Sequence, residues 1–247
     1  WGFRLPFAPV QIGILGGTGP AGKALAARLA SVGFEVVIGS RSKYRAMEVR
    51  DQTVGRWPKR NLDIGASDNH GAAQCGVVVV ATPWDGATET AMSVAPQLDG
   101  KVVICMANAL ARINGEFQPL VPPRGSVAAS VQAALPGSLV AAAMQHLPAK
   151  ELGMIDHPID SDVLICSDHP EAHECTADIV RKIPGLRPLD AGTLSNATPI
   201  EAFTAVLLEL NVRYKTRVAV KLTGIEDEPE PVVVVADEES ADEPSEA

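Results

Sequence analysis

Three glycines with the spacing G-x-G-x-x-G, Gly17, Gly19 and Gly22, directly follow an apolar run at 11–15 and precede a run with helical periodicity. In such a strand–turn–helix unit the first glycine allows a tight turn, the second lets a pyrophosphate approach the backbone, and the third lets helix and strand pack closely. The helix then directs free N–H groups and its positive dipole end at the phosphates. The loop therefore predicts a dinucleotide site, with a loop kept only for packing as the alternative.

The next apolar run ends in "GSRSKYR" at 39–45, where an NAD-selective domain usually presents Asp or Glu to the ribose 2'-hydroxyl. Ser40, Arg41, Lys43 and Arg45 stand there instead, and cations suit a 2'-phosphate. The pattern favours NADP(H) over NAD(H), and the alternative is a solvated basic turn.

The elements that must position these residues are short β-rich runs alternating with longer helical runs, which is typical of a parallel sheet with crossover helices. The run "GVVVVAT" at 76–82 is apolar at successive positions, as expected of a central strand buried on both faces. We therefore expect a Rossmann-like, doubly wound α/β fold with a smaller C-terminal α/β domain. The expected strands are 11–15, 35–38, 62–64, 77–81, 102–105 and 139–143, and the clearest helices are 21–32, 85–95 and 127–134.

The pattern changes after Pro148, where we expect a strand at 163–166, a helix at 170–182, the run "LRPLDAG" at 186–192 and a long helix at 199–222. The predicted organisation is an N-terminal extension at 1–10, an NADP-binding domain at 11–148, a small C-terminal domain at 149–225 and an acidic, disordered tail at 226–247. The extension has one Arg and two prolines and makes a poor signal peptide.

Charge and cysteine usage exclude several classes of protein. The formal net charge is −9, but ten of the thirty acidic residues follow Ile225, and the preceding chain carries twenty acidic and twenty-one basic residues. A nearly neutral body argues against broad nucleic-acid binding. No apolar run approaches the roughly 20 residues that span a bilayer. Four cysteines without a C-x-x-C pair are typical of buried thiols in a reducing compartment, so we expect a cytoplasmic protein.

The segment "CSDHPEAHEC" at 166–175 places Cys166, His169, His173 and Cys175 close together, as in a metal cluster. Pro170 is predicted to begin the helix, so His169 precedes it and does not share a helical face with His173. We therefore predict no metal site.

Five motifs resemble a known family, the NADPH-dependent reductases of coenzyme F420, also called F420H2:NADP oxidoreductases. The resemblance extends over about 11–222. The first motif is common to many Rossmann proteins, while the other four together are much more specific. The motifs are "LGGTGPAGKALAARLA" at 15–30, "GSRS" at 39–42, "ATPWDGA" at 81–87, "HLPA" at 146–149 and "GLRPLDAGTLSNA" at 185–197.

The resemblance implies a two-domain NADPH-dependent F420 reductase that binds NADP(H) on the large sheet and the deazaflavin in the cleft between the domains. Hydride would pass directly between the nicotinamide and deazaflavin rings, so the protein must align and dehydrate them and no catalytic side chain is expected. With the glycine motif and the strand-end loops, the predicted cofactor-binding residues are Gly17, Thr18, Gly19, Pro20 and Ala21 at the pyrophosphate, Ser40, Arg41 and Arg45 at the 2'-phosphate, and Pro83, Trp84, Thr88 and Ala149 along the rest of the NADP site. The predicted ring-positioning residues are Gln145, His146, Leu147 and Val218.

Two features depart from the family pattern. Gln145 occupies a position that is often His in the family, and the segment "CMANAL" at 105–110 is unlike the family's sequence there. Three side chains have two interpretations each: His146 donates to the deazaflavin or packs at a domain joint, Arg187 contacts cofactor or pairs with Asp190, and Asn196 contacts ligand or caps a helix.

Two other functions remain open. One is an NADPH-dependent reductase of a small carbonyl or imine substrate, for which Tyr214 or Lys221 is the only hint of a proton donor. The other is a non-catalytic NADP-sensing module. The expected partners are small-molecule cofactors, and the helix at 199–222 leaves a homodimer open.

Overall fold

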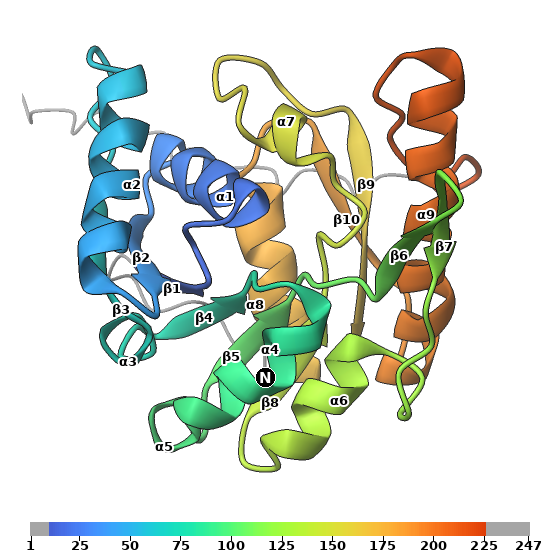
Figure 1. Cartoon of the computed structure of the whole chain (residues 1–247), viewed down its shortest axis with the longest axis horizontal. Coiled ribbons are helices and arrows are strands. Elements are labelled where there is room, and N and C mark those ends of the chain that lie inside the picture. The colour runs from blue at the N-terminus through green and yellow to red at the C-terminus, as the bar shows by residue number, and fades with distance from the viewer. Residues whose placement is uncertain (1–9, 226–247) are drawn as a thin grey trace, which may run out of the picture.

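The computed structural model describes residues 10–225 and contains one large, mainly parallel sheet (Figure 1). Every neighbouring pair of its strands is parallel except β8 with β9. This is the doubly wound α/β fold that the alternating pattern predicts. In spatial order the strands are β10 (Leu186–Asp190), β9 (Ser161–Ser167), β8 (Leu139–Ala142), β5 (Val102–Cys105), β4 (Val77–Val80), β1 (Gln11–Leu15), β2 (Glu35–Ser40) and β3 (Ile64–Asp68).

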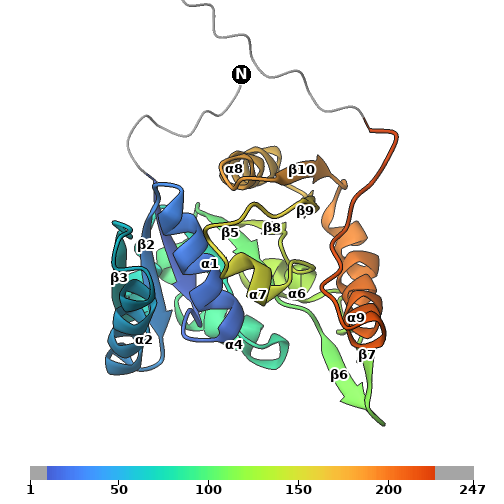
Figure 2. The ribbon, with the colours of Figure 1, turned by 90° about the horizontal axis from the view of Figure 1, so that it is seen from above.

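Helices cover both faces of the sheet, and each face has its own apolar cluster (Figure 2). Along β4, Val77 and Val79 belong to the first cluster and Val78 and Val80 to the second, so this strand is buried on both faces. The first cluster includes residues of α1 (Pro20–Ser31), α2 (Lys43–Arg56), α7 (Ala149–Leu152) and α8 (Pro170–Arg181). The second includes residues of α3 (Asn69–Ala72), α4 (Trp84–Ser93), α5 (Ala95–Leu98), α6 (Val127–Ala134), the 3-10 turn η1 (Leu194–Asn196) and α9 (Ala197–Tyr214).

The long C-terminal helix is shorter than predicted. Helix α9 ends at Tyr214 rather than residue 222, because Lys215 adopts a left-handed conformation with φ 52°. The chain then runs back along β9, where the Asp162 N–H donates to the Val220 carbonyl oxygen at 2.7 Å. Strand β3 also differs: it is Ile64–Asp68, not 62–64.

A hairpin that the sequence analysis did not predict follows β5. Its strands are β6 (Leu110–Ile113) and β7 (Glu116–Pro119), paired antiparallel across Asn114 and Gly115. Both turn residues have positive φ, 54° and 90°. The dipeptide Asn-Gly between two short runs is the strongest local signal for such a hairpin, so the sequence contained it.

The segment after Pro148 joins the first sheet, because β9 pairs antiparallel with β8 and β10 pairs parallel with β9. The division at 148 stays a prediction, and the expectations for residues 1–9 and 226–247 lie outside the described residues.

Helix α7 is held on α1 by a buried arginine. Arg28 is 1% exposed, and its guanidinium donates to five backbone carbonyls between Glu151 and His157. Burial lowers the pKa of Arg28, while the nearby carboxylates of Asp156 and Glu151 act in the opposite direction. Helix α1 and the segment that begins with Ala149 therefore form one packed unit.

Candidate functional site

The glycines of the loop have different structural roles from those that the G-x-G-x-x-G motif predicts. The tight turn belongs to Gly16, with φ 68°, rather than to Gly17. The Gly17 N–H donates to the carbonyl oxygen of Gly39 at 2.9 Å, and a Cβ on Gly22 would lie 2.7 Å from the Gly17 Cα. Gly17 and Gly22 thus hold β1, β2 and α1 together at distances that leave no room for side chains.

Gly19 is the open position of the loop. A Cβ placed there would meet only the Gly16 carbonyl oxygen at 3.5 Å and that of Ala81 at 4.0 Å. Gly19 is also the N-cap of α1, which has no side-chain cap, so the first backbone N–H groups of the helix are left without a side-chain partner. Donors at a helix N-terminus beside an uncrowded glycine fit a pyrophosphate.

The predicted 2'-phosphate residues lie at the end of β2 and the start of α2. The Ser40 Oγ accepts from the Ser42 N–H at 3.3 Å, and Ser42 caps α2 by accepting from the Arg45 N–H at 3.4 Å. Arg41 is exposed and makes no hydrogen bond or ion pair with any residue between 10 and 225. Arg45 pairs with Glu48 at 2.6 Å, whereas Arg41 and Lys43 have no ion-pair partner among residues 10–225, so both are available to a ligand.

The loop after β4 lies directly against the glycine loop, since a Cβ on Gly16 would meet the Thr82 Cγ2 at 2.4 Å. Pro83 is the N-cap of α4, and Trp84 begins the helix with about a third of its surface exposed. Thr88 follows one turn later on the same side of α4 and is half-buried. The structure therefore brings this loop to the carboxyl end of β1 beside the predicted pyrophosphate position.

The turn after β8 contains a buried, unpaired amide. Met144 adopts φ 63°, and Gln145 is 5% exposed. Neither the Oε1 nor the Nε2 of Gln145 has a hydrogen-bond partner among the described residues. An unpaired buried polar group costs about 1–3 kcal/mol unless a water or a ligand completes the pairing. Leu147 is also buried in this turn.

His146 lies next to Gln145 but faces the protein. Its Nε2 is 2.8 Å from the carbonyl oxygen of Asp162, which only accepts, so Nε2 donates. Burial lowers the pKa of His146, although the hydrogen bond to Asp162 and the Asp162 charge act against this. These contacts favour the packing interpretation of His146 over donation to a ring.

Arg187, for which cofactor contact and a pair with Asp190 were both open, has a different carboxylate partner in the structure. Arg187 instead binds Asp162 through two contacts of 2.8 Å, and the Leu222 N–H donates to the same carboxylate at 2.6 Å. Burial by itself would raise the pKa of Asp162, but these hydrogen bonds hold it below its usual range. This ion pair anchors the segment after α9 that carries Val218, which is half-buried.

Asn196 stands at the N-cap of α9 without a side-chain cap bond, and its Nδ2 donates to the Ala191 carbonyl oxygen at 2.7 Å. His169 lies before α8, as predicted, with its Nε2 3.1 Å from the Gln132 Oε1. Between residues 10 and 225 no three His, Cys, Asp or Glu side chains are arranged to hold a metal. Over the same range, every helix falls short of the length and apolar character that a membrane crossing needs.

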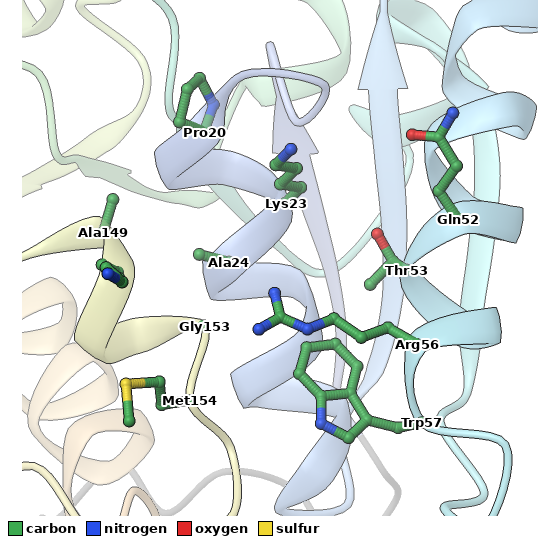
Figure 3. Close-up of a pocket in the computed structure, with 11 residues that line it drawn as sticks. Pro20, Lys23, Ala24, Gln52, Thr53, Arg56, Trp57, Ala149, Gly153 and Met154 are labelled. Atoms are coloured by element: carbon green, nitrogen blue, oxygen red, sulfur yellow. The ribbon is translucent and has the colours of Figure 1, made fainter.

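A cavity of about 600 Å³ lies over α1, between α2 and α7 (Figure 3). Of the predicted site residues, only Pro20 and Ala149 line it. The cavity adjoins the predicted pyrophosphate position and extends along α1 toward Trp57, away from the strand ends where the other predicted residues lie.

Comparison with known proteins agrees with this geometry. The family model described as NADP oxidoreductase, coenzyme F420-dependent, matches residues 11–109. The F420-dependent NADP reductase of Methanocaldococcus jannaschii is 34% identical over 223 residues, covering 88% of this chain and 100% of the relative. That of Methanothermobacter thermautotrophicus is 31% identical over 229 residues, covering 89% and 97%. A crystal structure from Arthrobacter sp. FB24, of a protein provisionally named an F420-dependent NADP reductase, has a TM-score of 0.74 at 22% identity, covering 86% of this chain and 99% of that one.

Proposed function

The chain belongs to the family of F420-dependent NADP reductases, and on that premise we propose that it transfers a hydride between NADP(H) and coenzyme F420. The observation that carries the proposal is the match with the Methanocaldococcus reductase along that protein's whole length. Because this match covers 88% of the chain, it extends well beyond residues 11–109 that the family model matches.

In the NADP half, the glycine loop and two strand ends bind the dinucleotide. The uncapped start of α1 binds the pyrophosphate through backbone N–H groups, with the open side of Gly19 toward the ligand. Arg41 reads the 2'-phosphate. The remaining contacts come from Gly17, Thr18, Pro20, Ala21, Ser40, Arg45, Pro83, Trp84, Thr88 and Ala149.

In the ring half, the cofactors supply the hydride donor and acceptor, and the protein aligns them and excludes water. Leu147 and Val218 contribute apolar surface, and Gln145 contributes an amide that has no hydrogen-bond partner within residues 10–225. His146 supports the turn by packing on β9. This arrangement needs no nucleophile or general base, since hydride moves directly between two rings.

The alternative reductase of a carbonyl or imine would need a proton donor near the site. Tyr214 is 68% exposed at the end of α9, and Lys221 pairs with Asp160 at 2.8 Å. Neither position therefore favours this alternative.

One assay separates F420 reduction from both alternatives. The protein is mixed with NADPH and F420, and the deazaflavin absorbance is followed, with NADPH binding measured in parallel by fluorescence. Loss of the absorbance supports the proposal. Bound NADPH with no change in absorbance would refute it and leave the carbonyl reductase, tested with imine and carbonyl substrates, or the NADP-sensing module.

We also infer a homodimer that forms through α9. Phe203 and Val206 lie one turn apart on this helix and are 44% and 48% exposed. Burying such a stripe against a second copy removes apolar surface from water. Sedimentation of the wild type should give twice the monomer mass and Phe203→Glu the monomer mass, and a monomeric wild type would contradict the inference.

A cytoplasmic location is likewise an inference. The four cysteines are buried and unpaired, and burial raises the pKa of the Cys105 thiol to about 12. Thiols of this kind are typical of reducing compartments. Cell fractionation with a tagged chain tests the location.

A further inference from the structure

The segment "CMANAL", which departs from the family pattern, connects two parts of the site. It begins at the end of β5 with Cys105 and leads into β6. Its Asn108 is half-buried and contacts two elements that are far apart in the sequence, the turn after β8 and helix α9. None of the site roles described above involves Asn108.

The contacts of Asn108 form a short chain of hydrogen bonds. The Thr204 Oγ1 on α9 donates to the Asn108 Oδ1 at 3.2 Å. The Asn108 Nδ2 then donates to the backbone carbonyl oxygen of Gln145 at 2.6 Å. Thr204 and Gln145 are buried and Asn108 is half-buried, so this chain is partly shielded from water and restricts the peptide of Gln145.

Asn108 donates to the backbone of Gln145, the residue whose side-chain amide has no hydrogen-bond partner among the described residues. The turn also contains Met144 in the left-handed region, a conformation that surrounding contacts must maintain. The buried amide of Gln145 offers one acceptor, Oε1, beside one donor, Nε2, and both are unsatisfied among the described residues. An amide pairs best with a group that presents a donor beside an acceptor in one plane.

We propose that Asn108 is a positioning residue that holds Gln145 so that its amide pairs with an amide-type edge of a substrate ring. The ligand chemistry is a planar donor–acceptor edge, found in the nicotinamide carboxamide and in the pyrimidine ring of the deazaflavin. Thr204 fixes the orientation of Asn108 by occupying its oxygen, which leaves the Nδ2 to face the Gln145 carbonyl. This assignment rests on the proposed function and specifies the ligand group that the Gln145 amide binds.

The principal test is Asn108→Asp, which keeps the shape but replaces the donating Nδ2 by an oxygen facing the Gln145 carbonyl. Dissociation constants for NADPH and for F420 are measured separately by fluorescence, beside kcat and both KM values. We expect the dissociation constant of one ligand to rise on the order of 10-fold, as for one lost hydrogen bond, while the other stays within about twofold. A higher dissociation constant for NADPH would mean that Gln145 pairs with the nicotinamide carboxamide. A higher dissociation constant for F420 would mean that it pairs with the pyrimidine ring of the deazaflavin.

A double-mutant cycle separates positioning from a merely structural role. If Asn108 acts through Gln145, Asn108→Ala should weaken binding in the wild type but have an effect within about twofold in the Gln145→Ala background. Thr204→Val, which removes the hydroxyl, should weaken binding of the same ligand, whereas Thr204→Ser, which keeps it, should bind that ligand as the wild type does. Asn61→Ala, at an exposed turn before β3, is the matched control. Thermal unfolding without ligand shows whether each variant is folded.

The outcomes are distinguishable from failure of the proposed function. If the wild type binds NADPH without reducing F420, the proposed function fails, whereas the NADPH arm of the cycle still tests Asn108. Additive effects of Asn108→Ala and Gln145→Ala would overturn the assignment. So would unchanged dissociation constants for both ligands in folded Asn108→Asp.

Discussion

Two glycines of the G-x-G-x-x-G motif, Gly19 and Gly22, should respond differently to replacement by Ala. Gly22→Ala places a Cβ 2.7 Å from the Gly17 Cα and 3.0 Å from the Gly16 carbonyl oxygen, both backbone atoms that cannot rotate away. Gly19→Ala meets nothing nearer than 3.5 Å, and its φ of −71° suits any residue. The first change therefore affects the fold, and the second affects only the space that a pyrophosphate would occupy.

The expected magnitudes follow from these contacts. Overpacking at Gly22 costs about 1–3 kcal/mol, and the better helix propensity of Ala offsets up to about 1 kcal/mol. With the full offset the net loss is about 0–2 kcal/mol, which lowers Tm by up to roughly 8 °C in a chain of this size. Gly19→Ala should change Tm by no more than about 2–4 °C, the effect of a poorer N-cap, but should weaken NADPH binding by more than about 10-fold because the methyl group separates phosphate from backbone.

Calorimetry without ligand and NADPH fluorescence titration measure the two effects separately. Gly55→Ala in α2 is the control, because a Cβ there meets nothing within 4 Å and Ala favours the helix. It should leave NADPH binding unchanged and Tm equal or higher. Normal NADPH affinity in Gly19→Ala, or a larger loss of Tm in Gly19→Ala than in Gly22→Ala, would refute the assignment of these glycines.

Three further changes test other contacts. Arg41→Ser should weaken NADPH binding by about 10- to 100-fold and leave NADH binding unchanged. Equal losses of affinity in titrations with both cofactors would show that Arg41 does not recognise the 2'-phosphate. Arg28→Met leaves the five carbonyls between Glu151 and His157 without their donor and should lower the urea-unfolding free energy by about 3 kcal/mol or more; a loss under about 1 kcal/mol would contradict this. Glu201 accepts two N–H bonds at the start of α6, and burial raises its pKa from 4.5 to about 7, so its contribution to stability is complete below pH 4.5 and is lost as pH rises through about 7. Between pH 5 and pH 8 this loss lowers the free energy of unfolding by up to about 3 kcal/mol, and Glu201→Gln should abolish it. Urea unfolding of both proteins at the two pH values measures the difference. The same pH dependence in Glu201→Gln as in the wild type would refute the prediction.

The strand, loop and helix of the nucleotide half could be predicted from the sequence because their causes are local. Gly19 and Pro20 begin α1 where the motif indicates, and the strand at Gln11–Leu15 has the predicted bounds. The apolar run of β4 likewise indicated a strand buried on both faces. Even the hairpin turn at Asn114 and Gly115 was present as a local signal, although it was overlooked.

The ring half was decided by contacts between distant parts of the chain. Strand β9 runs antiparallel to β8, which brings the backbone of Asp162 to His146, and it pairs parallel with β10, where Arg187 lies opposite Asp162. Asn108 reaches Gln145 across 37 positions because β5 and β8 are neighbours in the sheet. Amino-acid type and short spacing determine turns, caps and burial, since these depend on the conformations of adjacent residues. Which buried polar group meets which partner depends on strand order and direction, and these were set only when the whole sheet assembled.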